Sequence, residues 1–378
     1  MSATEEERLA RVALNRLAEP GDPRMAGLVT ELGAERVRDL LLAERSLDGV
    51  RTDVAARLAS LDPAAELERA DRVGLRFVVP GDREWPVGLD DLARAGTVGE
   101  RGGVPLGLWV RGRVRLDELS DAVAVVGSRS STGYGDTVAR DLSAVAARAG
   151  WCVVSGAAFG IDQAAHRGAL AVDGPTLAVL ACGADRAYPA AHRGLLGHVA
   201  DAGAVVSESA PGCSPMRVRF LARNRLIAAM ARGTVVVEAA VRSGALSTAT
   251  WTERLQRPLM GVPGPVTAAE SQGVHERIRS GAAVLVTGGH DVLELLGRPG
   301  EHLVEVPRAE PRPRDRLTTR QQQVLDAVPV ARPAGADSVA RTAGIGVREV
   351  YRALSLLEQQ GLVRRSPGGW TLDRAARA

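Results

Sequence analysis

The fold is decided by the segment Ala122-Val-Ala-Val-Val-Gly-Ser-Arg-Ser-Ser-Thr-Gly-Tyr-Gly135. Its first five residues are apolar, which is typical of a strand buried on both faces of a sheet. A loop rich in glycine and hydroxyl side chains follows, and the pattern becomes helical from about Thr137 to Ala149. A strand, a glycine-rich loop and a helix in this order predict the first unit of an open, parallel α/β sheet.

Five further apolar runs alternate with amphipathic helical segments. They begin at Trp151, Thr176, Gly203, Gly233 and Arg257, and they read WCVVSG, TLAVLACG, GAVVSES, GTVVVEAA and RPLMGVPG. Strands that alternate with helices in this way predict a doubly wound, Rossmann-like parallel sheet. We assign residues 71–297 to this domain, with the Gly- and Pro-rich stretch 75–112 as a lead-in that packs on the sheet.

Three flanking segments complete the predicted organisation. Residues 1–70 repeat apolar and charged positions at helical spacing, which predicts a small helical domain of the SAM-like or helix-hairpin-helix type. Residues 298–316 are rich in Pro and charge and form the predicted linker. Residues 317–378 contain three helical patterns and a short ribbon, which together predict a winged helix.

Composition excludes several classes of function. No apolar run reaches the roughly 20 residues of a membrane span, and the acidic amino end lacks a signal-peptide core, so we expect a cytoplasmic protein with no membrane contact. The three cysteines are far apart, and no His or Cys pair has zinc-ligand spacing, so no metal site is predicted. The chain has no Lys, and phosphate contacts must come from Arg, backbone N–H groups or hydroxyls.

The distribution of charge is more informative than the net charge of +3. Residues 301–378 carry 13 Arg against nine acidic residues, so the rest of the chain is close to neutral and any DNA site there must be a local patch. Residues 211–237 contain five Arg and no acidic residue, and the five are Arg217, Arg219, Arg223, Arg225 and Arg232. This segment is the candidate patch; the alternative is a solvated helix face.

The loop after the first strand is the first candidate site. Gly127, Ser128 and Arg129 follow the strand at the edge where ligands bind in open α/β sheets, beside a helix N-terminus that attracts anions. The loop matches neither G-x-G-x-x-G nor the Walker A pattern, so neither a dinucleotide nor ATP is predicted as cofactor. Arg129 adds a full positive charge, although a surface Arg with a structural partner is the alternative interpretation.

Other strand ends repeat this chemistry. Glycine and hydroxyl residues follow the strands at Ser155–Asp162, Cys182–Asp185 and Arg242–Thr248, so one edge of the sheet offers a groove of hydrogen-bond donors that fits a chain of phosphates. Phe220 lies between Arg219 and Arg223 in a helical pattern, and an aromatic ring beside arginines suits single-stranded nucleic acid. The alternative is a core Phe beneath a solvated Arg face.

The ordered set of motifs resembles the DNA-processing protein A (DprA, or Smf) family. These motifs are AVVGSR, SGxAxGID with His166, VLACGxDxxYP, SExxPG, FxxRNRLIA, VVVEAxxxSGALxTA, VPG and SQG, from about Trp85 to Gly281. The resemblance implies a non-catalytic, dimeric protein without cofactor that binds single-stranded DNA during natural transformation, protects it and helps to load the recombinase RecA. Winged-helix modules like the one predicted here accompany some family members.

The resemblance also implies which residues bind DNA. Gly127, Ser128 and Arg129 match the phosphate-binding loop of the family, and eight further residues match the same groove: Ser155, Gly156, Phe220, Arg223, Asn224, Arg225, Ser243 and Gly244. Three positions depart from the family pattern. Phe159 replaces an Arg, so one phosphate contact is either missing or replaced by a stacking contact, and His192 and His275 stand where Asn is usual.

Two rival functions stay open at this stage. Related folds occur in nucleotide phosphoribohydrolases of the "lonely guy" type, but their PGG-x-GT-x-x-E signature is lost between Arg242 and Glu253, and Glu208 and Glu238 at strand ends are more typical of loop-capping acids. The second rival is a regulator that binds duplex DNA through the winged helix. Arg348, Arg352, Arg364 and Arg365 are its candidate phosphate contacts.

Overall fold

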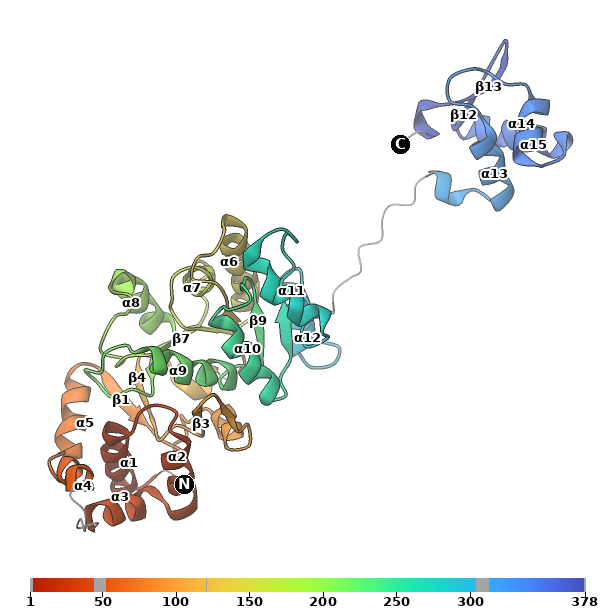
Figure 1. The fold of residues 1–378 in the computed structure, drawn as a ribbon. Helices are drawn as coiled ribbons and strands as arrows, with labels where there is room; N and C mark the ends of the chain where they lie inside the picture. The colour runs from red at the N-terminus through yellow and green to blue at the C-terminus, as the bar shows by residue number, and fades with distance from the viewer. Residues whose placement is uncertain (1–2, 44–51, 120, 304–312, 377–378) are drawn as a thin grey trace. The chain divides into compact units, whose positions relative to one another are not determined.

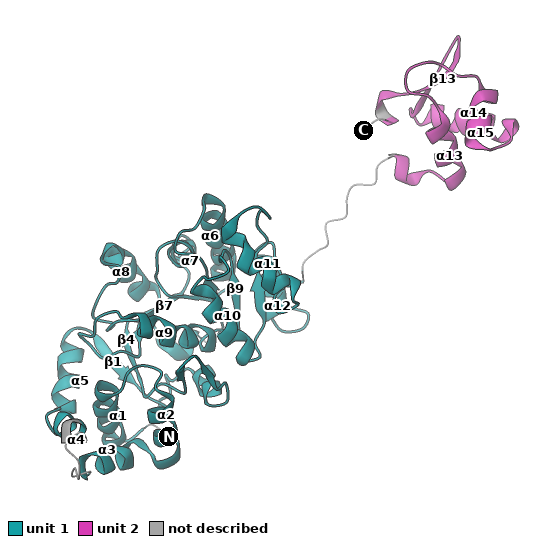
Figure 2. Ribbon diagram, viewed as in Figure 1, with its two compact units in different colours: residues 1–304 teal, residues 305–378 magenta. Residues whose placement is uncertain are grey.

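The computed structural model describes residues 3–43, 52–119, 121–303 and 313–376. The chain divides into two compact units, residues 1–304 and 305–378 (Figure 2). The division falls within the predicted linker 298–316, of which residues 304–312 lie outside the described residues.

The first unit is built on a nine-stranded sheet in the order β1-β4-β8-β7-β6-β5-β9-β10-β11 (Figure 1). The strands that pair in parallel are β5 (Ala122–Val126), β6 (Cys152–Ser155), β7 (Thr176–Leu180), β8 (Ala204–Ser207), β9 (Gly233–Val236), β10 (Leu259–Gly261) and β11 (Val284–Leu285). All six predicted strands are present as β5 to β10, so the predicted doubly wound α/β fold is confirmed.

The parallel strands β5 to β10 are buried on both faces because their side chains alternate between two layers, whereas both residues of the edge strand β11 are exposed. In β5, Val123 and Val125 join the core beneath one set of helices, whereas Ala124 and Val126 join the core on the opposite face. The first set is α6 (Gly133–Arg148), α7 (Ile161–Leu170) and α12 (Gly289–Leu296). The second set is α9 (Arg217–Ala229), α10 (Ala245–Arg254) and α11 (Gln272–Arg279). None of the described helices is long and apolar enough to cross a membrane.

The lead-in segment contributes strands of its own to the sheet. Strands β1 (Leu75–Val78) and β4 (Leu108–Arg111) pair with each other, and β4 adds to β8, each time antiparallel. The sheet is therefore mixed at this edge, which the glycine- and proline-rich sequence did not indicate. The remaining lead-in elements are the 3₁₀ turns η1 (Val87–Ala93) and η2 (Leu116–Leu119) and the short strands β2 (Thr97–Val98) and β3 (Arg101–Gly102).

The amino-terminal helices pack within the same compact unit as the sheet. They are α1 (Glu5–Leu17), α2 (Pro23–Leu32), α3 (Ala34–Ala43), α4 (Thr52–Ala59) and α5 (Pro63–Arg72). Buried Asn15 of α1 accepts a hydrogen bond from the Trp109 indole at 2.9 Å and donates to the Glu208 carbonyl at 2.8 Å. These bonds join the first helix to strand β4 and to the residue that directly follows β8. The bonded residues are 94 and 193 positions apart in the sequence.

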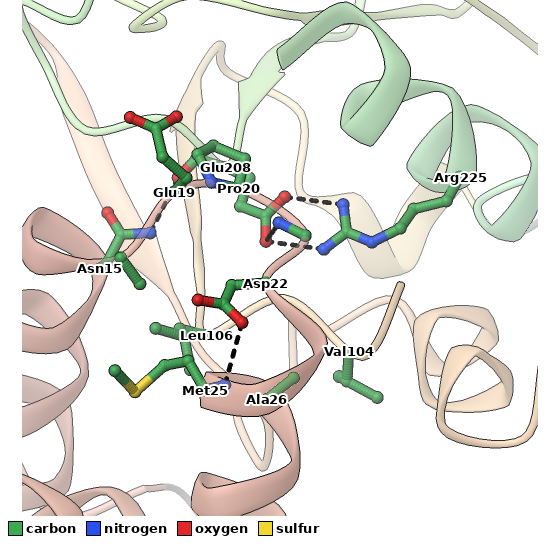
Figure 3. Close-up of a pocket in the computed structure, with 12 residues that line it drawn as sticks. Asn15, Glu19, Pro20, Asp22, Met25, Ala26, Val104, Leu106, Glu208 and Arg225 are labelled. Atoms are coloured by element: carbon green, nitrogen blue, oxygen red, sulfur yellow. Dashed lines mark hydrogen bonds and ion pairs between the residues drawn. The ribbon is translucent and has the colours of Figure 1, made fainter. Parts of the chain in front are cut away.

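A buried ion pair extends this junction to helix α9. The Arg225 guanidinium is fully buried and makes two hydrogen bonds of 2.7 Å with the Glu208 carboxylate. It also donates to the carbonyls of Gly103 and Ala222, and Glu208 accepts from the Gly21 amide at 3.2 Å. Figure 3 shows the pair beside the small pocket under the α1–α2 turn.

The second unit has three helices and a two-stranded ribbon, as predicted for a winged helix. The helices are α13 (Thr319–Ala327), α14 (Ala336–Ala343) and α15 (Val347–Gln359), and the ribbon is β12 (Val363–Ser366) with β13 (Gly369–Leu372). Its own apolar core includes Val324, Leu354 and Trp370. A reciprocal capping box between Thr318 and Gln321 begins α13.

We predict that Arg225→Ala lowers the free energy of unfolding by about 3–5 kcal/mol, because it leaves the buried Glu208 carboxylate without its positive partner. The measurement is chemical denaturation followed by circular dichroism. Arg217→Ala, at an exposed position on the same helix, is the matched control and should change stability by less than about 0.5 kcal/mol. Equal stability of the two variants would contradict the structural role of Arg225.

Candidate nucleic-acid interface

The carboxyl edge of the parallel sheet gathers the predicted site loops. Strands β6, β5 and β9 are neighbours, so the loops that follow them end side by side. The point between β5 and β9 is where the chain order reverses, since β6 to β8 lie on one side and β10 and β11 on the other. Open α/β sheets bind their ligands at this kind of position.

The loop between β5 and α6 is held by its own backbone. The Ser128 amide donates to the Glu238 carbonyl at 2.6 Å, and the Ser128 carbonyl accepts from the Ile161 amide at 3.1 Å. Gly127 is required here because a Cβ atom would lie 2.5 Å from the Ile161 side chain. Both backbone groups of Ser128 are thus occupied, and the loop presents the next residue, Arg129, as an exposed side chain.

The N-terminus of α6 already holds a carboxylate. Buried Glu238 accepts hydrogen bonds from the Thr132 amide at 2.9 Å and the Thr132 hydroxyl at 2.6 Å. This carboxylate occupies the position at which the helix N-terminus was expected to receive a phosphate. An incoming anion would meet a negative charge at this point, so the positive charge for binding must come from side chains instead.

A buried charge pair lies beneath the loop that follows β6. The Arg223 Nη1 atom is 4.0 Å from the Asp162 carboxylate, and both side chains are more than 90% buried. Gly156 leaves room for this guanidinium, because a Cβ atom would lie 1.2 Å from Arg223 Nη1. Asp162 also accepts from the amides of Gly156 and Ala158 at 3.2 and 3.4 Å.

Burial acts on both charges of this pair. Loss of solvation raises the pKa of the Asp162 carboxyl above its ordinary value and lowers the pKa of the Arg223 guanidinium, while each group's attraction for the other opposes these shifts. The Arg223 Nε atom has no hydrogen-bond partner among the described residues. Arg223 therefore places a positive charge beneath the carboxyl edge of the sheet and is not part of its exposed surface.

One aromatic ring contacts Arg129, and two further exposed rings lie in neighbouring loops. The Arg129 guanidinium lies 4.8 Å from the centre of the Phe220 ring, and the Tyr188 ring centre is 5.6 Å from that of Phe220. Phe159 packs edge-on against His192 at 4.7 Å and is 47% exposed, and Tyr188 is 42% exposed. Half-exposed rings next to an arginine provide both stacking surfaces and a cation. We name Arg129, Phe159, Tyr188 and Phe220 the aromatic edge.

The remaining predicted residues mainly build the framework of this edge. The Ser155 hydroxyl is buried and donates to the Val125 carbonyl at 2.7 Å. Asn224 donates to the Gly244 carbonyl at 3.3 Å, and the Ser243 hydroxyl accepts from the Ala245 amide at 3.3 Å. Gly244 is exposed at the start of α10.

The five-arginine segment does not form one continuous basic patch. Arg225 is fully buried against Glu208, so the expectation that it lines the groove is corrected. Arg219 makes two hydrogen bonds with Glu19 of the α1–α2 turn, at 2.7 and 2.9 Å. Arg232 pairs with Asp121 at the start of β5, at the opposite edge of the sheet. The sequence segment itself contains no acid, and these partners come from elsewhere in the chain.

The two histidines that depart from the family pattern hold loops. His192 is buried, and its Nδ1 is 2.9 Å from the Ala157 carbonyl. His275 Nε2 lies 3.1 Å from the Gly264 carbonyl. Sequence reasoning missed Tyr188 as a site residue; the scarcity of aromatic residues, with only three Tyr and three Phe in the chain, was the available signal.

Among the described residues, no group of three or more His, Cys, Asp or Glu is arranged to hold a metal ion. The three acids considered for an enzymatic role each have a structural partner. Glu238 caps the β5–α6 loop, Glu208 pairs with Arg225, and Glu253 pairs with Arg277 at 2.5 Å.

Comparison with known proteins places the chain in a family of DNA recombination mediators. The family profile described as "DNA recombination-mediator protein A" matches residues 76–297, and the "DprA winged helix domain" profile matches residues 308–369. A DNA processing protein DprA of Mycobacterium tuberculosis is 43% identical over 370 residues, which cover 96% of this chain and 93% of that protein. The chain belongs to the DNA processing protein A (DprA/Smf) family.

Other relatives agree with this assignment. The Smf protein of Escherichia coli is 35% identical, and the aligned residues cover 72% of this chain and 73% of that protein. The solved structure of DprA from Streptococcus pneumoniae has a TM-score of 0.64 and 28% identity, and covers 79% of this chain and 100% of that chain. The structure of the Helicobacter pylori protein, described for its single-stranded DNA binding mode, has a TM-score of 0.51 and 26% identity, and covers 58% of this chain and 94% of that chain.

Burial also determines the protonation of His166, which follows the SGxAxGID motif. His166 is fully buried, its Nδ1 lies 2.7 Å from the Thr176 hydroxyl, and its Nε2 has no partner among the described residues. Burial, together with the nearby His192 and Arg223, lowers its pKa from 6.5 to about 3. The imidazole therefore stays neutral in the folded protein at pH values where the unfolded chain is protonated.

We predict that His166 makes the protein lose stability as the pH falls from 6.5 towards 3, because only the unfolded state gains this proton. The loss is at most about 1.4 kcal/mol per pH unit. His166→Gln should flatten the dependence of the unfolding free energy on pH in this window, and His198→Gln, at an exposed position on α8 (Arg193–Ala202), is the control. The same slope in both variants would rule out this assignment.

Proposed function

We propose that this protein binds single-stranded DNA along the carboxyl edge of its central sheet and shields it without cleaving it. The observation that carries the proposal is the exposed Arg129 guanidinium, held 4.8 Å from the Phe220 ring beside half-exposed Phe159 and Tyr188. Membership of the DNA processing protein A family supports it, as does the likeness to the Helicobacter pylori protein with its single-stranded DNA binding mode.

The proposed contacts fall into two groups. Arg129, Phe220, Ser243 and Gly244 meet the strand, together with the backbone of Gly127 and the hydroxyl of Ser128. The second group supports the loops from beneath and consists of Ser155, Gly156, Arg223 and Asn224. Arg223 also adds one buried positive charge. Arg225 has a structural role instead. Phosphate contacts carry no sequence information, so little base preference is expected.

The aromatic edge favours a single strand over a duplex. Rings that are 42% and 47% exposed offer faces on which unpaired bases stack, whereas duplex bases are already stacked on one another. Phe159 is one of the three positions at which this chain departs from the family pattern, and here a ring replaces a charge. We propose that the chain exchanges one phosphate contact for one base contact at this position.

A binding role is preferred over hydrolysis because of the partners of the carboxylates. Glu208, Glu238 and Glu253 are held by Arg225, Thr132 and Arg277 respectively. A general acid or base must reach its substrate with a free oxygen of suitable proton affinity. All three carboxylates are already committed to internal bonds, which favours binding over hydrolysis.

The proposal extends to the biological setting that the family suggests. We infer that the protein works in the cytoplasm as a homodimer, protects single strands that enter during natural transformation, and helps to load RecA on them. The family description as a recombination mediator supports this part of the proposal.

Arg129→Ala should weaken binding of a fluorescent oligo-dT by about tenfold or more, because the exposed cation of the edge is lost. The slope of log affinity against log salt should fall by about 0.7, which is the value of one phosphate contact on a single strand. Fluorescence anisotropy across a salt series measures both quantities.

The matched control is Arg148→Ala. Arg148 is exposed in the last turn of the same helix whose first turn follows Arg129, so the variant removes an equal charge from the other end of α6. Its affinity should stay within about twofold of wild type. If Arg129→Ala binds as tightly as this control, single-strand binding does not occur at the proposed edge.

Phe159→Ala should weaken oligo-dT binding by about 1–3 kcal/mol, the worth of one stacked base. An abasic oligonucleotide of the same length retains the phosphates, so its affinity should be nearly equal for wild type and variant. Comparing the two ligands separates stacking from charge. A uniform loss for both ligands would mean that Phe159 only supports the loop through its contact with His192.

A further inference from the structure

The turn between α1 and α2 places an acid against the helix that carries Phe220. Glu19, in this turn, accepts two hydrogen bonds from the Arg219 guanidinium, at 2.7 and 2.9 Å. Arg219 belongs to the first turn of α9 and directly precedes Phe220 of the aromatic edge. The two paired residues are 200 positions apart in the sequence, so only the folded chain brings this negative charge to the helix.

The loop before α9 connects Arg219 with the aromatic edge. The carbonyl of exposed Ser214 accepts a hydrogen bond from Arg219 Nη1 at 2.7 Å, and its hydroxyl accepts from Arg186 Nη1 at 3.4 Å. Arg186 is exposed and stands two residues before Tyr188, whose ring centre is 5.6 Å from that of Phe220. The aromatic edge and the two guanidiniums therefore border the same loop.

The start of α9 is suited to a phosphate group. The first turn of this helix contains no acidic residue, and its N-cap residue, Met216, makes no capping side-chain hydrogen bond with the described residues. Free amides and the helix dipole favour an anion at such a position. The Glu19 carboxylate is the negative charge that the folded chain itself supplies to this turn.

Backbone contacts hold the acidic turn in place. The Gly21 amide donates to the Glu208 carboxylate at 3.2 Å, and the Gly21 carbonyl accepts from the Gly102 amide at 3.0 Å. Glu208 is bound in turn by the buried Arg225, so the turn rests on this buried ion pair (Figure 3). Glu19 is therefore held against α9 by the fold and not only by its own ion pair.

The pair of Glu19 and Arg219 is charged and partly exposed. The hydrogen bonds from Arg219 lower the pKa of the Glu19 carboxyl below its ordinary value, against the opposing effect of burial. The Glu19 side chain is 45% exposed, and that of Arg219 is 12% exposed. Ion pairs that water reaches contribute little to stability, so another anion can replace the carboxylate.

We propose that Glu19 competes with the DNA strand for Arg219 and so limits the affinity of the single-strand site, a role that rests on the proposed function. A strand phosphate that reaches the start of α9 displaces the Glu19 carboxylate before it pairs with Arg219. This exchange replaces one ion pair with another, so the contact releases little additional counterion and adds little affinity in the wild-type chain. The amino-terminal helices thus regulate the site through one carboxylate.

The test is Glu19→Gln in the full chain, with the fluorescent oligo-dT and a salt series. The amide keeps the size of the side chain and loses its charge, so the turn is retained while Arg219 becomes available to a phosphate. Affinity should rise by about three- to tenfold at low salt, and the slope of log affinity against log salt should steepen by about 0.7. Circular dichroism checks that the variant is folded.

The matched control is Glu6→Gln. Glu6 pairs with Arg38 at 2.7 Å in the first turn of α1, so this variant removes an equal charge from an ion pair at the other end of that helix. Its affinity should stay within about twofold of wild type. If Glu19→Gln binds no more tightly than this control, the proposal is wrong.

A double-mutant cycle separates competition for Arg219 from a general effect of charge. Combined with Arg219→Ala, Glu19→Gln should change affinity by less than about twofold, because no guanidinium is left to release. A gain that persists in this background would also overturn the proposal. Arg129→Ala distinguishes the two proposals: if it weakens binding while Glu19→Gln has no effect, only the competition fails. If Arg129→Ala has no effect, the proposed function fails and the competition fails with it.

Discussion

The buried pair of Arg223 and Asp162 is the constraint on which the carboxyl edge depends. Its guanidinium and carboxylate lie 4.0 Å apart under the loop that follows β6. Gly156 has no side chain, and this leaves the space that the guanidinium fills. A charge this deeply buried is tolerated only with a partner, so α9, β6 and α7 are fixed relative to one another. The partly buried ring of Phe220, on the same helix one turn before Arg223, is positioned by that arrangement.

The same residue type serves opposite purposes along helix α9. Arg225 is fully buried and pairs with Glu208, and Arg219 pairs with Glu19 of the amino-terminal segment. Arg223 places a positive charge beneath the carboxyl edge of the sheet. Arginine can fill all these roles because its planar fork makes several directed hydrogen bonds while keeping its charge. A chain without lysine depends on this versatility for both stability and binding.

Under the proposed function, the edge of this Rossmann-like sheet binds a polymer instead of a nucleotide. Glu238 holds the N-terminus of α6, where nucleotide-binding relatives of this fold place a phosphate group. The remaining surface is formed by side chains, with Arg129 and half-exposed rings in neighbouring loops. A shallow edge of cation and rings suits a long, repetitive ligand with both phosphates and bases better than a small molecule that must be enclosed.

The sequence by itself determined the fold class, the six principal strands, the winged helix and the family, because buried parallel strands and glycine-rich turns leave strong local patterns. It also singled out Arg129 and Phe220 as candidates, and the structure places the Arg129 guanidinium 4.8 Å from the centre of the Phe220 ring. Only the tertiary structure decided that the lead-in supplies the antiparallel strands β1 and β4, and that Arg219 and Arg225 are neutralised by Glu19 and Glu208. The physical reason is that a charge is free or paired according to what lies within about 4 Å in space, and the partners of these arginines are 200 and 17 residues away along the chain.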